Sequence, residues 1–276
     1  MAGNLAVLRS QIEASCAERV VAPFGYRDRK TVEVVSTGIP QFDAWAGGLP
    51  RGSLTEISSP VGAGNMSFLT ALLAARTSEA DVCALVDGRN AFDPRSAEAA
   101  GVNLDRLLWV RCRNIDQALR STDLLIQGGG FGVIALDLSD IAPEMVRHVP
   151  LNAWFRFRRA VEDTPTVFLV LDQEPNTRSS ASLALRLEMN EARWTSMAPI
   201  HEGQHAQTNA HTHTPGRLLG GFEVRAEILR SRIRPARSDD FQKKQPLAAT
   251  NAGDGELFRT AATWNSFRGL SETGTE

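Results

Sequence analysis

The feature of this sequence that most limits its fold is a series of short apolar runs that alternate with helical stretches. Residues 82–87, 132–137 and 166–171 are each almost wholly apolar, and the first two runs end in an aspartate. Runs of this length are typical of strands that are buried on both faces of a parallel sheet. The stretches between them, such as residues 67–76 and 115–127, predict the crossover helices of βαβ units.

The pattern changes after residue 179. Residues 183–194 and 222–233 alternate apolar and polar side chains, as antiparallel strands with one wet face do. The predicted fold class is therefore α/β, with a mostly parallel central sheet flanked by helices and antiparallel strands added at the C-terminal side. We expect an N-terminal helix and linker, a core with a mobile loop, and a mostly disordered polar tail, which span residues 1–31, 32–237 (loop 196–217) and 238–276.

Composition limits the class of protein. A chain of 276 residues with 42% hydrophobic residues can build one α/β domain with its own core. Its formal net charge of -2 excludes a global positive field, so any binding to nucleic acid must come from local patches. Three cysteines without CxxC spacing favour a reducing compartment and no metal site. The sequence shows neither a leader pattern nor an apolar run of ~20 residues, so we expect a cytoplasmic protein.

Residues 59–67 stand between a predicted strand and a predicted helix, where a phosphate-binding loop belongs. Such a loop needs glycines for close backbone approach, a lysine for the β- and γ-phosphates and a hydroxyl for Mg²⁺. Gly62 and Gly64 meet the first need, but Asn65 stands at the lysine position and Met66 at the hydroxyl position. An amide brings no positive charge and a thioether is a poor magnesium ligand. Taken alone, this loop is a degenerate phosphate site.

Ordered segments around the loop resemble the RecA family. Residues 35–43 read Val-Ser-Thr-Gly-Ile-Pro-Gln-Phe-Asp and residues 47–52 read Gly-Gly-Leu-Pro-Arg-Gly, like the segments that precede the family's phosphate loop. Residues 86–94 resemble the family's segment with the catalytic glutamate and an Asp-Pro pair. The order of these matches is more specific than any one of them.

The resemblance continues to the end of the predicted core. Residues 133–139 look like the Walker B strand, here with Asp137, and residues 167–173 like the strand that ends in the phosphate-sensing glutamine, here Gln173. The resemblance spans roughly residues 4–242 and implies a RecA-like core.

The same resemblance shows what is missing. The position of the catalytic glutamate holds Arg89, which stays protonated and cannot act as a base. The adenine-stacking tyrosine falls at Ser96, and both DNA-binding loops of the family are reduced. Because lysine and glutamate are lost together, we predict a pseudo-ATPase that has no catalytic residues, requires no cofactor and binds ATP or ADP weakly at most. The predicted degenerate nucleotide site comprises Ser59, Pro60, Gly62, Gly64, Asn65, Met66, Ser67, Arg89, Asp137 and Gln173.

This degeneracy is similar to that of the ImuA family, the RecA-like, SulA-related accessory proteins of bacterial mutasomes. Residues 172–175 and 181–188 carry the likeness, together with Arg193 and Trp194. The resemblance implies an adaptor in DNA-damage-induced translesion synthesis. Its partners would be RecA, an ImuB-like inactive Y-family polymerase and an error-prone C-family polymerase, with DNA contacted indirectly and no membrane. Two alternatives stay open: a nucleotide-dependent recombinase-like protein that binds single-stranded DNA, and an SOS-linked regulator of cell division.

Candidate partner-binding residues fall in three places. Leu5, Leu8 and Ile12 share the apolar face of a helix predicted over residues 4–20, which resembles the RecA segment that packs on the next protomer. Arg230 and Arg232 stand where two RecA lysines reach a neighbour's ATP, and a solvated strand edge is the alternative interpretation. Aromatic residues of the polar tail can anchor in a partner's groove or on the protein's own surface; they are Trp264 and Phe267, with Phe258 upstream.

Two further clusters favour a structural interpretation. Residues 154–159 mix aromatics with arginines, as proteins that bind single strands do. A helix sends these aromatics in different directions, which predicts core aromatics beneath a basic outer face. Four histidines lie in a polar loop without cysteine or rigid spacing, which favours a solvated linker over a metal site; they are His201, His205, His211 and His213.

Overall fold

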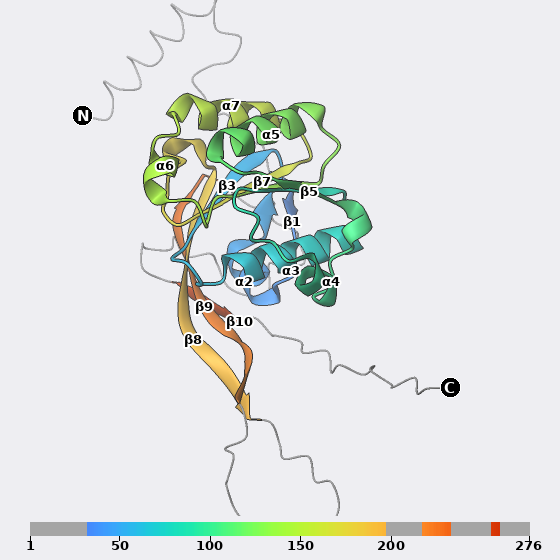
Figure 1. The fold of residues 1–276 in the computed structure, drawn as a ribbon, viewed down its shortest axis with the longest axis vertical. Helices are drawn as coiled ribbons and strands as arrows, with labels where there is room; N and C mark the ends of the chain where they lie inside the picture. Colours follow the sequence, from blue (N-terminus) through green and yellow to red (C-terminus); the bar gives the residue numbers. More distant parts are fainter. Residues whose placement is uncertain (1–31, 197–216, 233–254, 260–276) are drawn as a thin grey trace, which may run out of the picture. The chain divides into compact units, whose positions relative to one another are not determined.

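A computed structural model describes residues 32–196, 217–232 and 255–259 (Figure 1). The chain divides into two units, Met1–Thr31 and Val32–Glu276, and the described residues all belong to the second. The helix predicted over residues 4–20 and most of the predicted loop and tail lie outside the described residues.

Eight strands form the central sheet in the order β10-β9-β8-β3-β7-β6-β4-β5. All neighbours from β8 through β5 are parallel, whereas β8 with β9 and β9 with β10 are antiparallel. The predicted fold class is therefore confirmed. The strands are β3 (Ser53–Ser58), β4 (Cys83–Asp87), β5 (Leu107–Arg111), β6 (Val133–Asp137), β7 (Val167–Asp172), β8 (Leu183–Ser196), β9 (Arg217–Ser231) and β10 (Glu256–Arg259), and β1 (Val34–Val35) pairs separately with β2 (Leu49–Pro50).

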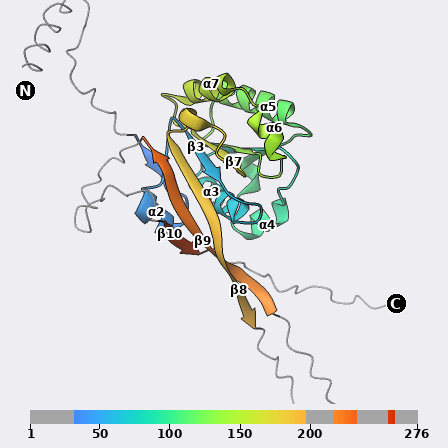
Figure 2. The same cartoon turned by 90° about the vertical axis from the view of Figure 1, so that its left-hand side faces the viewer.

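Helices cover both faces of the sheet (Figures 1 and 2). One face carries α2 (Pro40–Ala46), α3 (Asn65–Ser78) and α4 (Pro94–Ala99), and the other carries α5 (Ile115–Gly128), α6 (Pro143–Arg147) and α7 (Leu151–Val161). Two short 3₁₀ turns, Leu104–Arg106 and Arg178–Ser180, complete the described elements. None of the helices in the described ranges is both long enough and apolar enough to cross a membrane.

Each face of the sheet has its own hydrophobic core, because successive strand residues point to opposite faces. Leu85 and Ala135 pack in the cluster that contains Leu72 of α3. Val86 and Leu136, one position further along, pack in the cluster that contains Trp154 of α7. Strands between two helical layers are buried at every position, which explains their unbroken apolar sequences.

Strands β8 and β9 are the longest in the sheet, with 14 and 15 residues. They run beyond the helical layers as a two-stranded ribbon (Figure 2). Their pairing shifts register at three places, which increases local bending and twist. Met189 is 48% exposed and Trp194 is 53% exposed on this ribbon, because no helix covers it there.

Within residues 238–276, which we predicted to be mostly disordered, the structure describes a short strand, β10. Glu256–Arg259 pairs with β9, and Phe258 is 1% exposed. Its ring lies edge-on to Phe42 of α2 and Phe68 of α3, with both centroids at 6.3 Å. Burial of this aromatic ring against α2 and α3 stabilises the short strand. The surrounding polar sequence gives no indication of a strand here.

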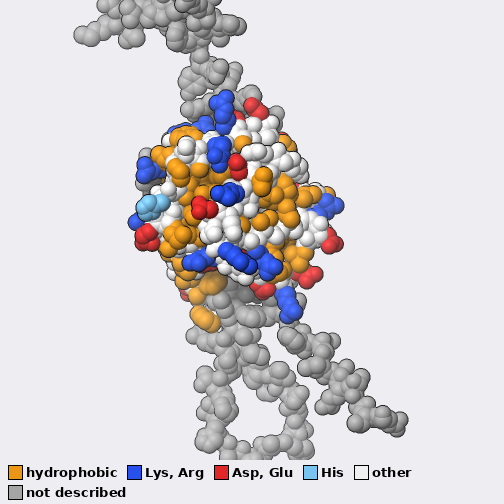
Figure 3. All heavy atoms as spheres, turned by 45° about the horizontal axis from the view of Figure 1, so that its top comes forward, with side chains coloured by type: hydrophobic (Ala, Val, Ile, Leu, Met, Phe, Trp, Pro, Cys, Tyr) orange, Lys and Arg blue, Asp and Glu red, His pale blue; other side chains and the backbone are white. Residues whose placement is uncertain are grey.

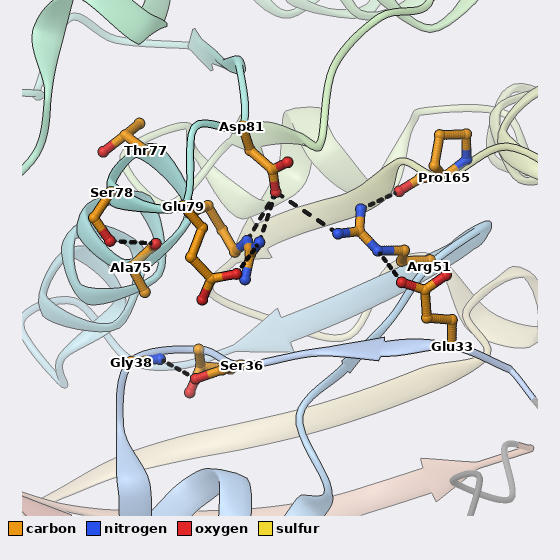
Figure 4. Close-up of polar contacts among 12 residues, drawn as sticks. Glu33, Ser36, Gly38, Arg51, Ala75, Thr77, Ser78, Glu79, Asp81 and Pro165 are labelled. Carbon is orange, nitrogen blue, oxygen red and sulfur yellow. Dashed lines mark hydrogen bonds and ion pairs between the residues drawn. The ribbon is translucent and has the colours of Figure 1, made fainter.

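The amino ends of the parallel strands are held by charged side chains (Figure 4). Arg76 of α3, which is 4% exposed, donates to Asp81 at 2.9 Å and to Glu79 at 2.8 Å. Arg51 donates to the Pro165 carbonyl at 2.6 Å and to Glu33 at 3.1 Å, and its other nitrogen lies 3.7 Å from Asp81. This ionic network joins the turn before β3, the end of α3 and the turn before β7.

Candidate functional site: the predicted nucleotide site

Four parallel strands end side by side at the edge of the sheet where α/β proteins commonly bind ligands. β3, β4, β6 and β7 lead respectively into the loop before α3, the turn at Gly88, the segment Ser139–Ile141 and the turn at Gln173. This convergence brings together the residues that the sequence predicted for a degenerate nucleotide site.

The loop of residues 59–64 is anchored to its neighbours. The Ser59 amide donates to the Asp172 carbonyl at 2.9 Å, and the Ala63 amide to the Pro60 carbonyl at 3.1 Å. Gly64 has a φ of 106°, and a Cβ there would lie 2.9 Å from a Val224 methyl carbon of β9. Glycine is therefore required at this position by conformation and by space. Gly62 is exposed, and a Cβ atom at this position would have no neighbour among the described residues within 4 Å.

Asn65 is the first residue of α3 and is 8% exposed. Its Nδ2 donates to the Ser139 hydroxyl at 3.1 Å and to the Asp172 carbonyl at 3.4 Å. Its Oδ1 is buried and has no hydrogen-bond partner among the described residues. The neighbouring Met66 is half-buried and packs against the core cluster of α3, and Ser67 is half-buried as well. The helix therefore begins with a neutral amide that is already bound within the protein.

Asp137 and Gln173 bind the same short segment. Asp137, which is 4% exposed, accepts a hydrogen bond from the Ser139 amide at 3.0 Å. Burial raises the pKa of Asp137 to about 6, the Ser139 hydrogen bonds oppose this shift, and the nearby carboxylates of Asp87 and Asp140 add to it. Gln173 Nε2 donates to the carbonyls of Ser139 at 2.7 Å and Ile141 at 3.3 Å. Both residues thus lie where they were predicted, with partners inside the chain.

Arg89 is exposed after the end of β4. Its Nε donates to the Asp140 carbonyl at 3.2 Å, and its backbone amide donates to Asp87 at 3.1 Å. Asp87 also accepts from the amides of Ala91 and Phe92 and from the Trp109 indole, the last at 3.1 Å. Asp87 therefore fixes the conformation of the loop that carries Arg89. The sequence indicates such a role, because Asp87 is a charged residue at the end of a buried strand.

Ser96, at the position of the predicted adenine contact, is part of a helix cap. Its hydroxyl donates to the carboxylate of Asp93, which is the N-cap of α4 and also accepts from the backbone amides of Arg95 and Ser96. This arrangement is a local solution to the unpaired amides of a helix N-terminus.

Sequence reasoning missed Glu56, which is fully buried in the middle of β3. Its carboxylate accepts from the amides of Asn176 and Thr177 and from the Thr177 hydroxyl, each at 2.7 Å. Burial raises the pKa of Glu56, and these hydrogen bonds oppose the shift. A charged residue between the buried Leu54 and Ile57 was the available signal, because buried charges have specific partners.

Asp172 assists Glu56 in holding the turn after β7. It accepts from the Asn176 side chain at 2.8 Å and from the Gln173 amide at 2.7 Å. Burial raises the pKa of Asp172 to about 6. Residues 174–180, where the resemblance to RecA predicts a reduced DNA-binding loop, are thus fixed on the sheet edge.

Arg230 and Arg232 do not share one environment. The Arg230 guanidinium donates to the Arg178 carbonyl, and its charge lowers the pKa of Glu56, so this side chain serves the 174–180 turn. Arg232 is exposed, and its backbone amide donates to the Ser182 carbonyl at 2.8 Å. The four histidines of the loop lie outside the described residues. So do five candidate partner residues, which are Leu5, Leu8, Ile12, Trp264 and Phe267.

The aromatic and basic stretch of α7 divides as predicted between core and surface. Trp154 and Phe157 are fully buried, whereas Phe155 is 43% exposed. The exposed face of the helices combines apolar and basic side chains (Figure 3), and Arg156 donates across to Asp123 of α5 at 3.2 Å. A surface hollow is lined by Phe155, Arg158, Arg159 and Glu162.

Comparisons with known proteins show sequence similarity to RecA. RecA from Deinococcus radiodurans is 36% identical over 130 residues, which are 46% of this chain and 36% of that protein. RecA from Rickettsia canadensis is 34% identical over 135 residues, 48% of this chain and 39% of that protein. These matches span well under half the length of these relatives. The model of the RecA N-terminal domain matches residues 4–146, which is more than half of the 276 residues. The chain therefore belongs to the RecA N-terminal domain family.

Proposed function

We propose that this protein is a non-catalytic RecA-like adaptor in DNA-damage-induced translesion synthesis. The observation that carries the proposal is the state of Asn65. Its carboxamide stands at the start of α3, where phosphate loops place a lysine, and it is bound to Ser139 and Asp172. Phosphoryl transfer depends on neutralising charge on the transferred group, and a buried neutral amide supplies none of it.

Arg89 supports the same conclusion from the other side of the site. Its guanidinium carries a permanent positive charge and donates to the Asp140 carbonyl. A residue that activates an attacking water must accept a proton or orient the water, and a guanidinium has no acceptor. Asp137, with its pKa raised to about 6, is bound to Ser139 and lies at the end of β6. The loop therefore offers ATP no cation at residue 65, and the position of the catalytic glutamate offers no base.

The loops that correspond to the DNA-binding loops of RecA are short, which favours binding to proteins over direct binding to DNA. The connection between β6 and α7 is occupied by α6, and the turn after β7 is fastened to Glu56 and Asp172. Together with the resemblance to the ImuA family, this supports a bridge between RecA and an error-prone polymerase complex with an ImuB-like subunit. Arg232, exposed at the end of β9, is our first candidate for the RecA contact.

The test is to tag the protein, damage the source cells and identify what co-purifies. We expect RecA and polymerase subunits, and we expect Arg232→Ala to weaken the recovery of RecA. Arg120→Ala, which removes an exposed arginine of α5, serves as the matched control. Recovery of neither partner, with the protein retained on single-stranded DNA, would contradict the adaptor function.

One observation favours a second candidate, a RecA relative that binds single-stranded DNA. Phe155 is exposed beside Arg158 and Arg159, and an aromatic ring among cations suits stacked bases and phosphates. Fluorescence anisotropy with a labelled oligonucleotide separates the candidates. Binding that is lost in Phe155→Ala with Arg159→Ala, and that weakens steeply with salt, would favour this alternative.

A further inference from the structure

Four side chains of the degenerate nucleotide site converge on three consecutive residues. Asn65 from α3, Arg89 from the turn after β4, Asp137 from the end of β6 and Gln173 from the end of β7 all bind the segment Ser139–Ile141. They come from four separate parts of the sequence. Such convergence on one short segment indicates a shared structural role.

The donors and acceptors of this set are complementary. Asn65, Arg89 and Gln173 each offer an N–H donor, and the segment offers the Ser139 hydroxyl and three carbonyl oxygens. The single acceptor of the set, Asp137, takes the Ser139 amide.

Two of the four side chains are the ones that remove the catalytic chemistry. A lysine at residue 65 would place a charged ammonium group where the side chain is 8% exposed, and a glutamate at residue 89 would have no donor for the Asp140 carbonyl. The substitutions therefore replace groups that act on phosphate and water with groups that bind the protein's own backbone.

We propose that Asn65, Arg89, Asp137 and Gln173 form an internal latch that holds the segment Ser139–Ile141 in place without nucleotide. This inference uses one part of the proposed function, which is that the site does not turn over ATP. The latched segment leads directly into α6, where Met145 is 46% exposed and Arg147 pairs with Glu174 at 2.6 Å. The segment that precedes α6 is thus held in place whether or not ATP is bound.

Hydrogen exchange of the full chain, read by mass spectrometry over residues 138–149, tests the latch. We expect Asn65→Ala and Gln173→Ala each to speed exchange of this segment about tenfold, because each variant removes hydrogen bonding that holds Ser139–Ile141. Val61→Ala is the matched control, since Val61 lies in the same loop and is 70% exposed. Addition of Mg-ATP to the wild-type protein should leave exchange in the segment unchanged.

Two results would overturn the latch. One is unchanged exchange over residues 138–149 in both variants, and the other is marked slowing of that exchange in the wild type by Mg-ATP. If Asn65→Ala unfolds the protein, Arg89→Ala decides, because the Arg89 side chain is exposed and its loss should raise exchange only locally. This readout is independent of RecA and polymerase binding, so failure of the latch is distinguishable from failure of the adaptor function.

Discussion

The two ends of the parallel strands are held together by different chemistry. At the amino ends, Arg51 and Arg76 pair with Asp81, Glu33 and Glu79 in an ionic network (Figure 4). At the carboxyl ends, the amides of Asn65 and Gln173 bind a hydroxyl and carbonyl groups. Three buried carboxyl groups beside them have raised pKa values; they are Glu56, Asp137 and Asp172.

The two ends differ in how their buried charges are paired. The amino ends belong to the scaffold, and the carboxyl ends form the candidate site. The amino-end network has opposite charges close together, so each charge is compensated. Among the residues that the structure describes, the buried acids of the carboxyl end form no comparable ion pair. This is the edge of the sheet where α/β proteins commonly bind ligands. We infer that the carboxyl end carries a cost in stability at neutral pH which the amino end does not carry. The predictions below test this contrast.

The largest effect is expected at Glu56. In Glu56→Leu the amides of Asn176 and Thr177 and the Thr177 hydroxyl lose their shared acceptor. We expect the free energy of unfolding, measured with urea, to fall by about 4 kcal/mol, since each buried unpaired group costs about 1–3 kcal/mol. Glu56→Gln keeps one acceptor oxygen and should lose less than half as much. Equal stability of Glu56→Leu and wild type would show that the 174–180 turn is held by other contacts.

The next effect is at the amino end. Arg76→Met removes the partner of Asp81 and Glu79 from a site that is 4% exposed, and we expect a loss of about 3 kcal/mol. The loss should be the same at pH 5 and pH 8, because the pKa of arginine lies far above this range. Arg51→Met is the comparison, with a smaller loss expected because its nearest contact to Asp81 is 3.7 Å. A loss for Arg76→Met that varies strongly between the two pH values would contradict the contrast between the ends.

A smaller effect of opposite sign is expected at Asp137. Its pKa is about 6 in the folded protein against 3.8 for an ordinary aspartate carboxyl, so the folded state holds the proton more tightly than the unfolded state. Stability therefore falls as pH rises from 4 to 6 and is constant above that window. Asp137→Asn removes this cost and should raise the free energy of unfolding at pH 7.5 by about 2 kcal/mol. The pKa shift corresponds to about 3 kcal/mol, and the weaker hydrogen bonding of a neutral amide to Ser139 offsets about 1 kcal/mol of it.

The stabilisation by Asp137→Asn should disappear at pH 4, where the wild-type carboxyl is protonated in the folded state. Glu98→Gln, which removes an exposed carboxylate of α4, is the matched control and should show no such pH dependence. Destabilisation by Asp137→Asn at pH 7.5 would contradict the cost in stability that we ascribe to the buried carboxylate.

The smallest effect is expected at Trp109. Trp109→Phe removes one of four hydrogen bonds to Asp87 and keeps an aromatic ring against Phe92. We expect a loss of about 1 kcal/mol in the free energy of unfolding, the usual contribution of one hydrogen bond. A loss several times larger would show that the Asp87 loop depends on the indole for its conformation.

The sequence was sufficient for the parallel part of the fold. β4, β6 and β7 are buried on both faces, so their apolar runs are long enough to identify them, and the helices between them follow. β10 could not be predicted, because four residues in a polar region give no periodicity, and Phe258 docks through contacts with α2 and α3 that are distant in sequence. α6 is likewise only five residues long.

The candidate site was predictable as a set of positions but not as a set of contacts. Asn65, Arg89, Asp137 and Gln173 were identified from motif order, and the structure brings all four to one edge. Their common partner, Ser139–Ile141, has no sequence signature, because a segment that offers backbone carbonyls can have almost any side chains. Glu56 was missed for a related reason, since its partners lie 120 and 121 residues away.

The central claim is that a RecA-family core here works without turning over ATP. Its most direct test is phosphate release by the purified full chain with Mg-ATP, with and without single-stranded DNA. We predict no release above the background of Asp137→Ala, with or without DNA. Release that DNA stimulates and that Asp137→Ala abolishes would contradict the account and favour a nucleotide-dependent recombinase-like protein.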